Sequence, residues 1–395
     1  MQYFLSRRIS THRKPSAALF LTLCVSSAGA AAGGYVQSNL VTDDQAFLTS
    51  QGYTPAAHVD PLLQNPWGIA FFPGNPGNPL WTANNGTNSA TLYDGQGNKI
   101  PLNVTVSGAP TGQVNGGFNF HLAGQVNNSL FIFASENGTI SEWNTDGAVF
   151  SNTSQVAVDH SSTGAIYKGL AEATVGGAHR LYATNFHSGQ VEVFDSNYGS
   201  VINPPGAFTD PNLPVGYVPF GIQNIQGDLF VTYAKAAGAD DVPGIGHGFV
   251  DVYHADGTLV SRVASRGVLN SPWGVALAPA SFGEFAGDLL IGNFGDGLIN
   301  VFDSTTHAFI DHLVDINGEA IQIDGLWGLI FGAGALNAAP NDLYFTAGIG
   351  DEAHGLFGVL NPAPVPLPAS LPLLTGALGW LGLRRRAKAS VTATT

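Results

Sequence analysis

Acidic and amide side chains in glycine-rich loops are the first residues of this sequence that could do chemistry. Asp240 and Asp241 lie in "KAAGADDVPGIGHG" (235–248), and Asp351 and Glu352 lie in "GIGDEAHG" (348–355). Further candidates stand in shorter loops: Asp296, Asn85, Asn185 and Asn293. Carboxylate and amide oxygens are the ligands that Ca²⁺ prefers. The loops therefore predict a Ca²⁺ or related hard-cation site, with Asn185, Asn293, Asp296 and Asp351 as its ligands.

The same loops also have a purely structural interpretation. Asp-Gly and Asn-Gly are common turn sequences, because Asn and Asp hydrogen-bond their own backbone and Gly adopts positive φ. No EF-hand or other fixed ligand spacing is present. Both interpretations stay open on the sequence alone.

Acid–base catalysis is a second chemistry that the residue types allow. The candidate bases are His187, His247 and His354, and Glu172 is a candidate carboxylate partner. Glu172 stands in "GLAEAT" between apolar neighbours, so it is expected to point into a central channel, where it would either act on a substrate or contact water. The catalytic candidates are therefore Glu172 and His187. No nucleophile elbow, P-loop, dinucleotide-binding glycine motif or HExxH helix is found, and no cofactor other than a cation is expected.

A repeat of about 50 residues must position these loops. Its first strand opens at a glycine in six places: Gly68, Gly117, Gly169, Gly221, Gly274 and Gly328. A second and a third short strand follow each glycine, and Asp-Gly and Asn-Gly turns punctuate these runs, which is the pattern of antiparallel hairpins. The chain is thus predicted to be all-β, a six-bladed β-propeller over residues 33–361. The last repeat lacks a fourth strand, so "YVQSNLVTD" (35–43) is expected to complete blade six and close the ring.

Two near copies of one motif, "NPWGIAF" (65–71) and "SPWGVAL" (271–277), belong to this repeat. Trp67, Trp273 and Trp327 share one repeat position and are expected to fill the wedges between blades. The glycine after each Trp is expected to let crowded inner strands approach closely.

The two ends of the chain have the composition of targeting segments. Residues 1–32 combine a basic start, an apolar run and small residues, as a secretory signal peptide does. The only cysteine, Cys24, lies inside this segment, so the mature chain is expected to contain no disulfide and no thiolate site. Residues 362–395 form a Pro-rich linker, an apolar stretch and an Arg cluster, and we expect transient membrane contact through this tail.

The charge balance limits the partners. Eight of the 14 basic residues lie in the two terminal segments and all 28 acidic residues lie between them, so the body carries 6 − 28 = −22. Such a surface repels nucleic acid, and it favours cations, sugars or neutral partners.

Two resemblances support this interpretation. "LYATNFHSGQVEVFDSN" and "LLIGNFGDGLINVFDST" resemble NHL-type propeller repeats, although Gln190-Val191 and Leu298-Ile299 stand where those repeats usually have Asn-Arg. The C-terminal "VPLPAS", apolar stretch and Arg cluster resemble the PEP-CTERM sorting tail, with Leu367 in the position of the usual Glu. Taken whole, the chain resembles an uncharacterised family of exported bacterial propellers with such tails. The resemblance implies export to the cell envelope or the extracellular space and processing by an exosortase, and it implies no known activity.

We therefore expect a non-enzymatic binding or scaffold propeller whose ligand is an extracellular molecule, polysaccharide or protein. The alternative is a metal-dependent hydrolase or lyase of the lactonase-like six-bladed type, whose channel metal is held by Asn, Asp and Glu. The two differ in geometry. The enzyme would be favoured if four side chains converged at the channel mouth: Glu172, Asn185, Asn293 and Asp296. It would be excluded if these side chains were dispersed.

Overall fold

The computed structural model describes residues 33–72, 77–146 and 149–364. The expected signal peptide (1–32) and most of the expected tail (365–395) lie outside these residues. The described residues between 33 and 364 form one compact unit. In the part of the chain that is described, no helix is long and apolar enough to cross a membrane.

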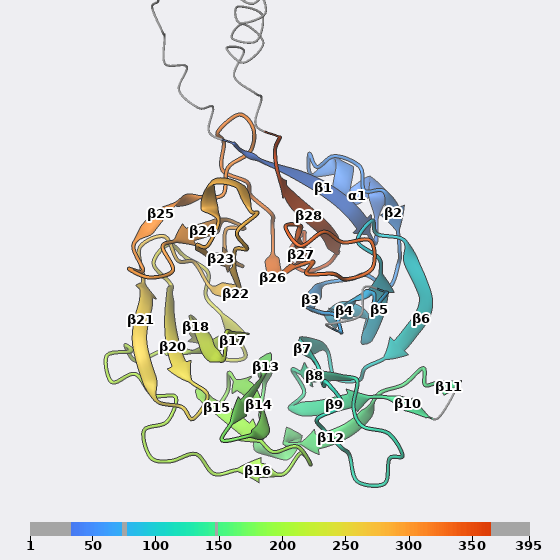
Figure 1. Ribbon diagram of the computed structural model, residues 1–395, viewed down its shortest axis with the longest axis vertical. Helices are drawn as coiled ribbons and strands as arrows, with labels where there is room; N and C mark the ends of the chain where they lie inside the picture. The colour runs from blue at the N-terminus through green and yellow to red at the C-terminus, as the bar shows by residue number, and fades with distance from the viewer. Residues whose placement is uncertain (1–32, 73–76, 147–148, 365–395) are drawn as a thin grey trace, which may run out of the picture. The chain divides into compact units, whose positions relative to one another are not determined.

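Six antiparallel sheets stand around a common centre, which confirms the predicted all-β, six-bladed propeller (Figure 1). The strands run from the inside of each blade outward as follows. Blade one has β3 (Pro66–Ala70), β4 (Leu80–Asn84), β5 (Ser89–Tyr93) and β6 (Lys99–Thr105), and blade two has β7 (Pro110–Asn115), β8 (Phe131–Ser135), β9 (Thr139–Trp143) and β12 (Gln155–Asp159). Blade three has β13 (Tyr167–Val175), β14 (Ala178–Asn185), β15 (Gln190–Phe194) and β16 (Ser200–Val201), and blade four has β17 (Tyr217–Ile225), β18 (Asp228–Ala237), β20 (Gly248–His254) and β21 (Leu259–Ser265). Blade five has β22 (Pro272–Leu277), β23 (Leu289–Asn293), β24 (Ile299–Phe302) and β25 (Phe309–His312), and blade six has β26 (Leu326–Phe331), β27 (Leu343–Ala347), β28 (Leu356–Pro362) and β1 (Tyr35–Thr42).

Short elements decorate this frame. The helix α1 (Gln45–Ser50) follows β1, and β2 (His58–Val59) pairs with β1. The two-residue strand β19 (Asp240–Asp241) folds back on β18, and β10 (Thr145–Asp146) pairs with β11 (Val149–Phe150). The β19 segment matters for the site, because it returns a pair of acidic residues toward the centre of the ring.

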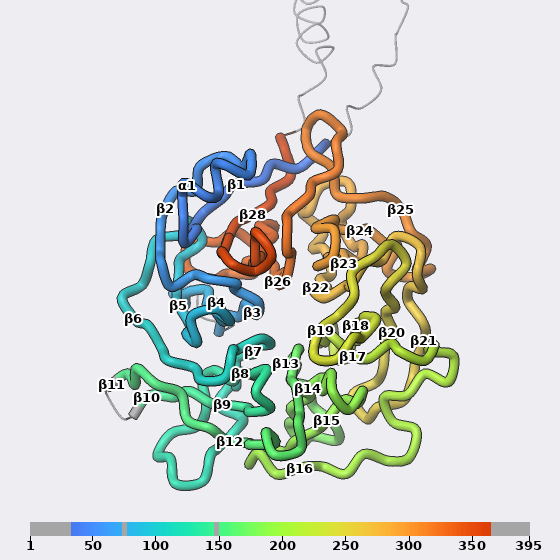
Figure 2. Tube along the Cα trace, turned by 180° about the vertical axis from the view of Figure 1, so that it is seen from behind, coloured from blue at the N-terminus to red at the C-terminus, as the bar shows by residue number. Residues whose placement is uncertain are grey.

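The N-terminal strand closes the last blade, as predicted. β1 pairs antiparallel with β28, from Tyr35 opposite Pro362 to Thr42 opposite Leu356. Strands from the two ends of the described chain therefore lie side by side, as both views show (Figures 1 and 2). Tyr35 anchors the joint, since it is buried and its hydroxyl donates to the Phe282 carbonyl at 2.9 Å. Closure of this kind leaves no open sheet edge at the junction of first and last blade.

A ring of glycines allows the six inner strands to crowd together. These residues are Gly68, Gly112, Gly169, Gly221, Gly274 and Gly328. A Cβ added to any of them would lie less than 3.0 Å from backbone of the inner strand of the next blade, and the sequence of contacts runs once around the ring. The expected reason for the repeated glycine is thereby confirmed.

Blade two corrects one part of the predicted repeat. Its ring glycine is Gly112 in "PTGQVN", whereas Gly117, which we expected to open the strand, lies beyond the end of β7 and has φ 58°. The strand was missed because the polar residues Thr111 and Gln113 stand where the other first strands have mostly aromatic and aliphatic residues.

Candidate functional site

The residues that precede the ring glycines meet at the centre of the propeller. They are Trp67, Thr111, Lys168, Phe220, Trp273 and Trp327. We expected the tryptophans to fill separate wedges between blades, and this expectation was wrong. The rings of Trp67 and Trp327 stack with centroids 3.4 Å apart, and Trp273 meets them edge-on at 6.1 and 5.9 Å. Indoles from blades one, five and six therefore form one central aromatic cluster, together with Phe186 and Phe220.

Lys168 is the charged member of this set. It is only 2% exposed. Its ammonium nitrogen lies 2.5 Å from Glu136 Oε1 and 3.3 Å from Asp240 Oδ1. The same nitrogen lies 5.1 Å from the centre of the Trp67 ring and 5.7 Å from that of Phe186. A buried ammonium needs such partners, because the loss of its hydration is costly; here two carboxylates and two aromatic faces supply them.

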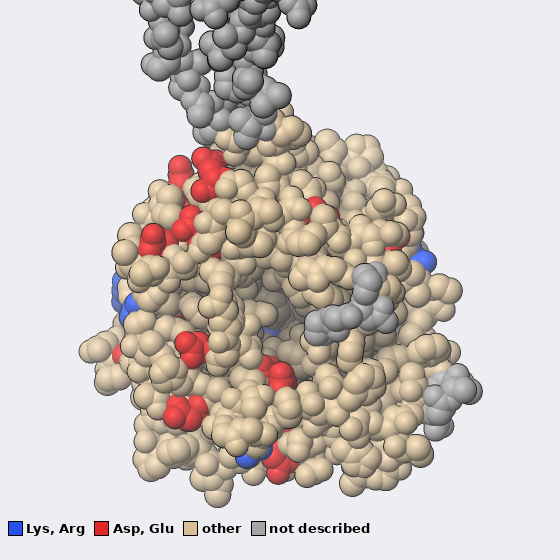
Figure 3. Space-filling view, viewed as in Figure 1, with Lys and Arg blue, Asp and Glu red and all other residues tan. Residues whose placement is uncertain are grey.

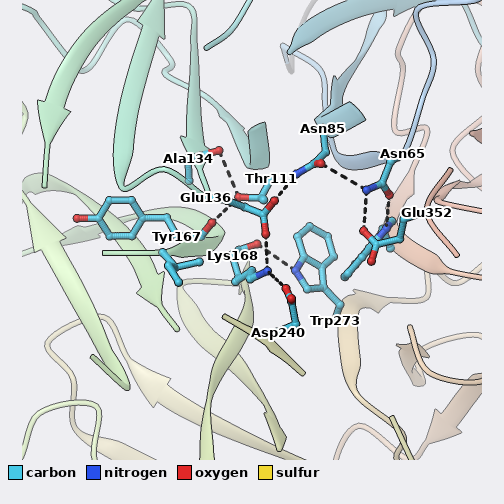
Figure 4. A network of polar contacts seen from close by, with 12 residues as sticks. Asn65, Asn85, Thr111, Ala134, Glu136, Tyr167, Lys168, Asp240, Trp273 and Glu352 are labelled. Atoms are coloured by element: carbon cyan, nitrogen blue, oxygen red, sulfur yellow. Dashed lines mark hydrogen bonds and ion pairs between the residues drawn. The ribbon is translucent and has the colours of Figure 1, made fainter. Parts of the chain in front are cut away.

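A chain of hydrogen bonds extends from this lysine around the mouth of the ring (Figure 4). Asn85 Nδ2 donates to Glu136 Oε2 at 2.9 Å. Asn65 Nδ2 lies 3.4 Å from Asn85 Oδ1 and donates to Glu352 Oε2 at 2.6 Å. On the other side, the Trp327 indole N–H donates to Asn65 Oδ1 at 3.0 Å.

The elements that carry this chain come from five blades. Asn65 immediately precedes β3, Asn85 follows β4, and Glu136 follows β8. Lys168 lies in β13, Asp240 in β19, and Glu352 in the connection from β27 to β28. The connections between second and third strands therefore meet on one face. We call these six residues the mouth network: Asn65, Asn85, Glu136, Lys168, Asp240 and Glu352.

The mouth network has more acidic than basic groups. Burial raises the pKa of Glu352, and the hydrogen bond from Asn65 and the charge of Lys168 oppose that shift. Burial also raises the pKa of the neighbouring Asp241, again against the charge of Lys168. These carboxyl groups are thus held where their charge is disfavoured, which makes the site receptive to hydrogen-bond donors and to positive charge.

Glu172, the first catalytic candidate, lies away from this mouth. In the β13–β14 hairpin Glu172 is opposite Leu181, whereas Asn185 is opposite Tyr167 near the other end. Glu172 does line a cavity at the inner strands, as expected of a channel residue. Its partner is His179, whose Nδ1 lies 2.7 Å from Glu172 Oε1, and not His187, His247 or His354.

The expected histidines are scattered. His187 is exposed in the connection from β14 to β15. His247 Nδ1 lies 2.8 Å from the Val242 carbonyl, and His354 Nδ1 lies 3.0 Å from Asp43 Oδ2. None of the three reaches Glu172, so the predicted acid–base pair is not formed.

The predicted cation ligands that form hydrogen bonds also do so within their own blades. Asn185 Nδ2 donates to Glu192 Oε1 at 2.6 Å, within blade three. Asn293 Nδ2 donates to Asp296 Oδ1 at 3.0 Å, within blade five, and this is the one contact among the candidates. Asp351 is exposed and has φ 54°. Among the described residues, no group of three or more His, Cys, Asp or Glu side chains is placed to hold a metal ion together.

Sequence reasoning missed the centre of the site. Lys168 and Glu136 were not among the candidates, although Asn85, Asp240 and Glu352 were named as candidates in their loops. One signal was available: Lys168 occupies a repeat position that holds Trp in three blades and Phe in a fourth. A second missed cluster joins His160 to Glu192 (3.0 Å) and to the Tyr167 hydroxyl (2.8 Å) in blade three.

Two relatives of the chain are proteins of a mimivirus. An uncharacterized protein of Acanthamoeba polyphaga mimivirus is 36% identical over 334 residues, which cover 79% of this chain and 78% of that protein. A second uncharacterized mimivirus protein is 34% identical over 337 residues, covering 80% of this chain and 84% of that protein. No protein-family model matches the chain. These relatives do not bear on the bacterial sorting-tail part of our expectation.

Solved structures resemble the chain in fold. A streptogramin B lyase structure superimposes with a TM-score of 0.48 at 12% identity, covering 83% of this chain and 97% of that one. A structural genomics protein of unknown function from Bacteroides thetaiotaomicron gives a TM-score of 0.49 at 10% identity, covering 83% of this chain and 76% of that one. Likeness at this level does not extend to activity.

Proposed function

The chain belongs to the same family as the two uncharacterized mimivirus proteins. We propose that it is a non-enzymatic binding propeller. Its ligand is held over the mouth network, on the face where the connections between second and third strands meet. The ligand is neutral or positively charged, because the body of the chain carries 28 acidic and only six basic residues, and one of the six is the buried Lys168.

One observation carries this proposal. The residues that a lactonase-like centre would need, Glu172, Asn185 and Asn293, lie in separate places and are bonded within their own blades. The polar groups that do converge are instead paired around a lysine. An arrangement of paired amides, carboxylates and indoles offers hydrogen bonds and charge for recognition.

The terminal segments suggest where the ligand is met. Residues 1–32 have the pattern of a signal peptide. Residues 362–395 have the pattern of a PEP-CTERM tail, which an exosortase processes. Both patterns support export, so the partner is an extracellular polysaccharide or protein at the cell envelope or in the surrounding matrix. Cell fractionation tests this part: full-length protein retained in the inner membrane would contradict processing of the tail.

The binding role is tested with arrays of neutral, basic and anionic polysaccharides and peptides. Asp240→Asn changes an exposed carboxylate of the mouth network, and the matched control Asp311→Asn changes an exposed carboxylate of β25. We expect retention of neutral or basic probes, with affinity lowered several-fold by Asp240→Asn and unchanged by Asp311→Asn. Retention of anionic probes only, or equal effects of the two variants, would contradict the proposal.

A further inference from the structure

A cavity lies further along the inner strands, away from the mouth network. Its volume is about 270 Å³. It is lined by polar side chains of three neighbouring blades: Gln113 and Asn115 of β7, Glu172 of β13, and Gln223 and Asn224 of β17. Glu172 follows Lys168 by four residues on β13, a rise of about 13 Å along an extended strand. The face of the ring drawn in Figure 3 is hollowed at its centre, where inner strands meet.

Gln113 breaks the repeat at this cavity. The residue after the ring glycine is a buried aliphatic residue in five blades: Ile69, Leu170, Ile222, Val275 and Leu329. In blade two it is Gln113, which is 6% exposed. Neither Oε1 nor Nε2 of Gln113 has a hydrogen-bond partner among the described residues. A buried amide without partners is unfavourable, so the fold gains nothing from Gln at a position that otherwise takes Leu, Ile or Val.

Other groups at the cavity have free hydrogen-bonding capacity as well. The side chains of Asn115 and Gln223 make no hydrogen bond within the described ranges. Asn224 is fixed, since its Nδ2 donates to the Glu172 carbonyl at 2.6 Å. The Glu172 carboxylate is bonded to His179 through one oxygen. The cavity thus combines amide donors, amide acceptors and one carboxylate.

The remaining wall is apolar, and it includes Phe71. Among the residues that the structure describes, no Lys or Arg lines the cavity. An anionic ligand would therefore meet Glu172 without a compensating positive charge. A purely apolar ligand would leave the amide of Gln113 unpaired.

We propose that this cavity binds a small neutral polyhydroxylated molecule, a single sugar ring or a polyol. A hydroxyl group both donates and accepts, so it can pair with each amide and with the Glu172 carboxylate. The C–H faces of such a molecule suit the apolar wall. The volume equals roughly nine water molecules, which matches one ring and not an oligosaccharide. The site is distinct from the mouth network and does not depend on the function proposed for it.

The test uses saturation-transfer NMR on the purified protein, with glucose, galactose, mannose, ribose, glycerol and myo-inositol as probes. We expect transfer to at least one of these probes. Gln113→Leu gives blade two the aliphatic residue of the other blades, so it should keep or raise the melting temperature and weaken binding at least ten-fold. Gln223→Leu provides a second variant at the same cavity with the same expected loss.

Asn300→Leu is the matched control. Asn300 is fully buried in β24 with an unpaired Oδ1, and it does not line the cavity. Binding should survive in Asn300→Leu. The proposal is overturned if no probe binds the wild-type protein, which would mean that ordered water alone fills the cavity. It is also overturned if both cavity variants bind as the wild type does, or if the control loses binding equally.

Discussion

Replacement of Lys168 by Met should destabilise the propeller, because it leaves the acidic groups of the mouth network without their cation. Loss of one member of a fully buried ion pair costs about 3–5 kcal/mol. The side chain of Lys168 is 3% exposed, but those of Glu136 and Asp240 are 29% and 79% exposed. Solvent therefore screens part of the loss, and we expect the free energy of unfolding to fall by about 2 kcal/mol.

Urea unfolding followed by tryptophan fluorescence measures this change, since Trp67 lies directly beneath the ammonium group. Lys235→Met is the matched control, because Lys235 is exposed and its loss should change stability by less than about 0.5 kcal/mol. A change for Lys168→Met as small as that of the control would refute the claim that this lysine holds the network together.

Three further predictions follow from the same contacts. Burial raises the pKa of Glu352 above its ordinary value of 4.5. Between that value and the raised pKa of the folded state, the folded protein binds more protons than the unfolded protein, so stability falls as the pH rises. Glu352→Gln should flatten this slope in melts between pH 4.5 and 7.5, and an unchanged slope would contradict it. Gly274→Ala places a Cβ less than 3.0 Å from the Trp327 carbonyl, which should cost about 1–3 kcal/mol in urea unfolding, whereas a neutral effect would show that the inner ring is loosely packed. Tyr35→Ala removes a buried ring and its hydrogen bond to Phe282, so it should cost about 3–5 kcal/mol if β1 completes blade six, and retention of the wild-type melting temperature would argue against that closure.

The frame of this fold was predictable because its determinants are local and periodic. The ring glycine, the hairpin turns and the unpaired strand 35–43 can each be recognised within a few residues. The exception is β7, where Thr111 and Gln113 replace apolar residues and conceal the strand. Gln113 of this strand also lines the cavity, so the blade that departs from the repeat is the one that indicates a binding site.

The mouth network was harder to predict because its members are separated by up to 287 residues, as in the bond from Asn65 to Glu352. Their proximity is set by closure of the ring, which pairs β1 with β28 and brings the first and last blades together. Asn185 and Asn293 were named as cation ligands from the sequence, but their contacts are local. They end the second strands of their blades, and their side chains satisfy neighbouring backbone and carboxylate groups there.

The most direct test of the central claim is the metal content of the purified protein after dialysis against Ca²⁺, paired with melting curves in Ca²⁺ and in EDTA. If the mouth network is organised by Lys168, Ca²⁺ should remain far below one ion per chain and the two melting temperatures should agree. One tightly held Ca²⁺ per chain, with a melting temperature that falls in EDTA, would contradict this account. That result would favour the metal-dependent hydrolase or lyase instead.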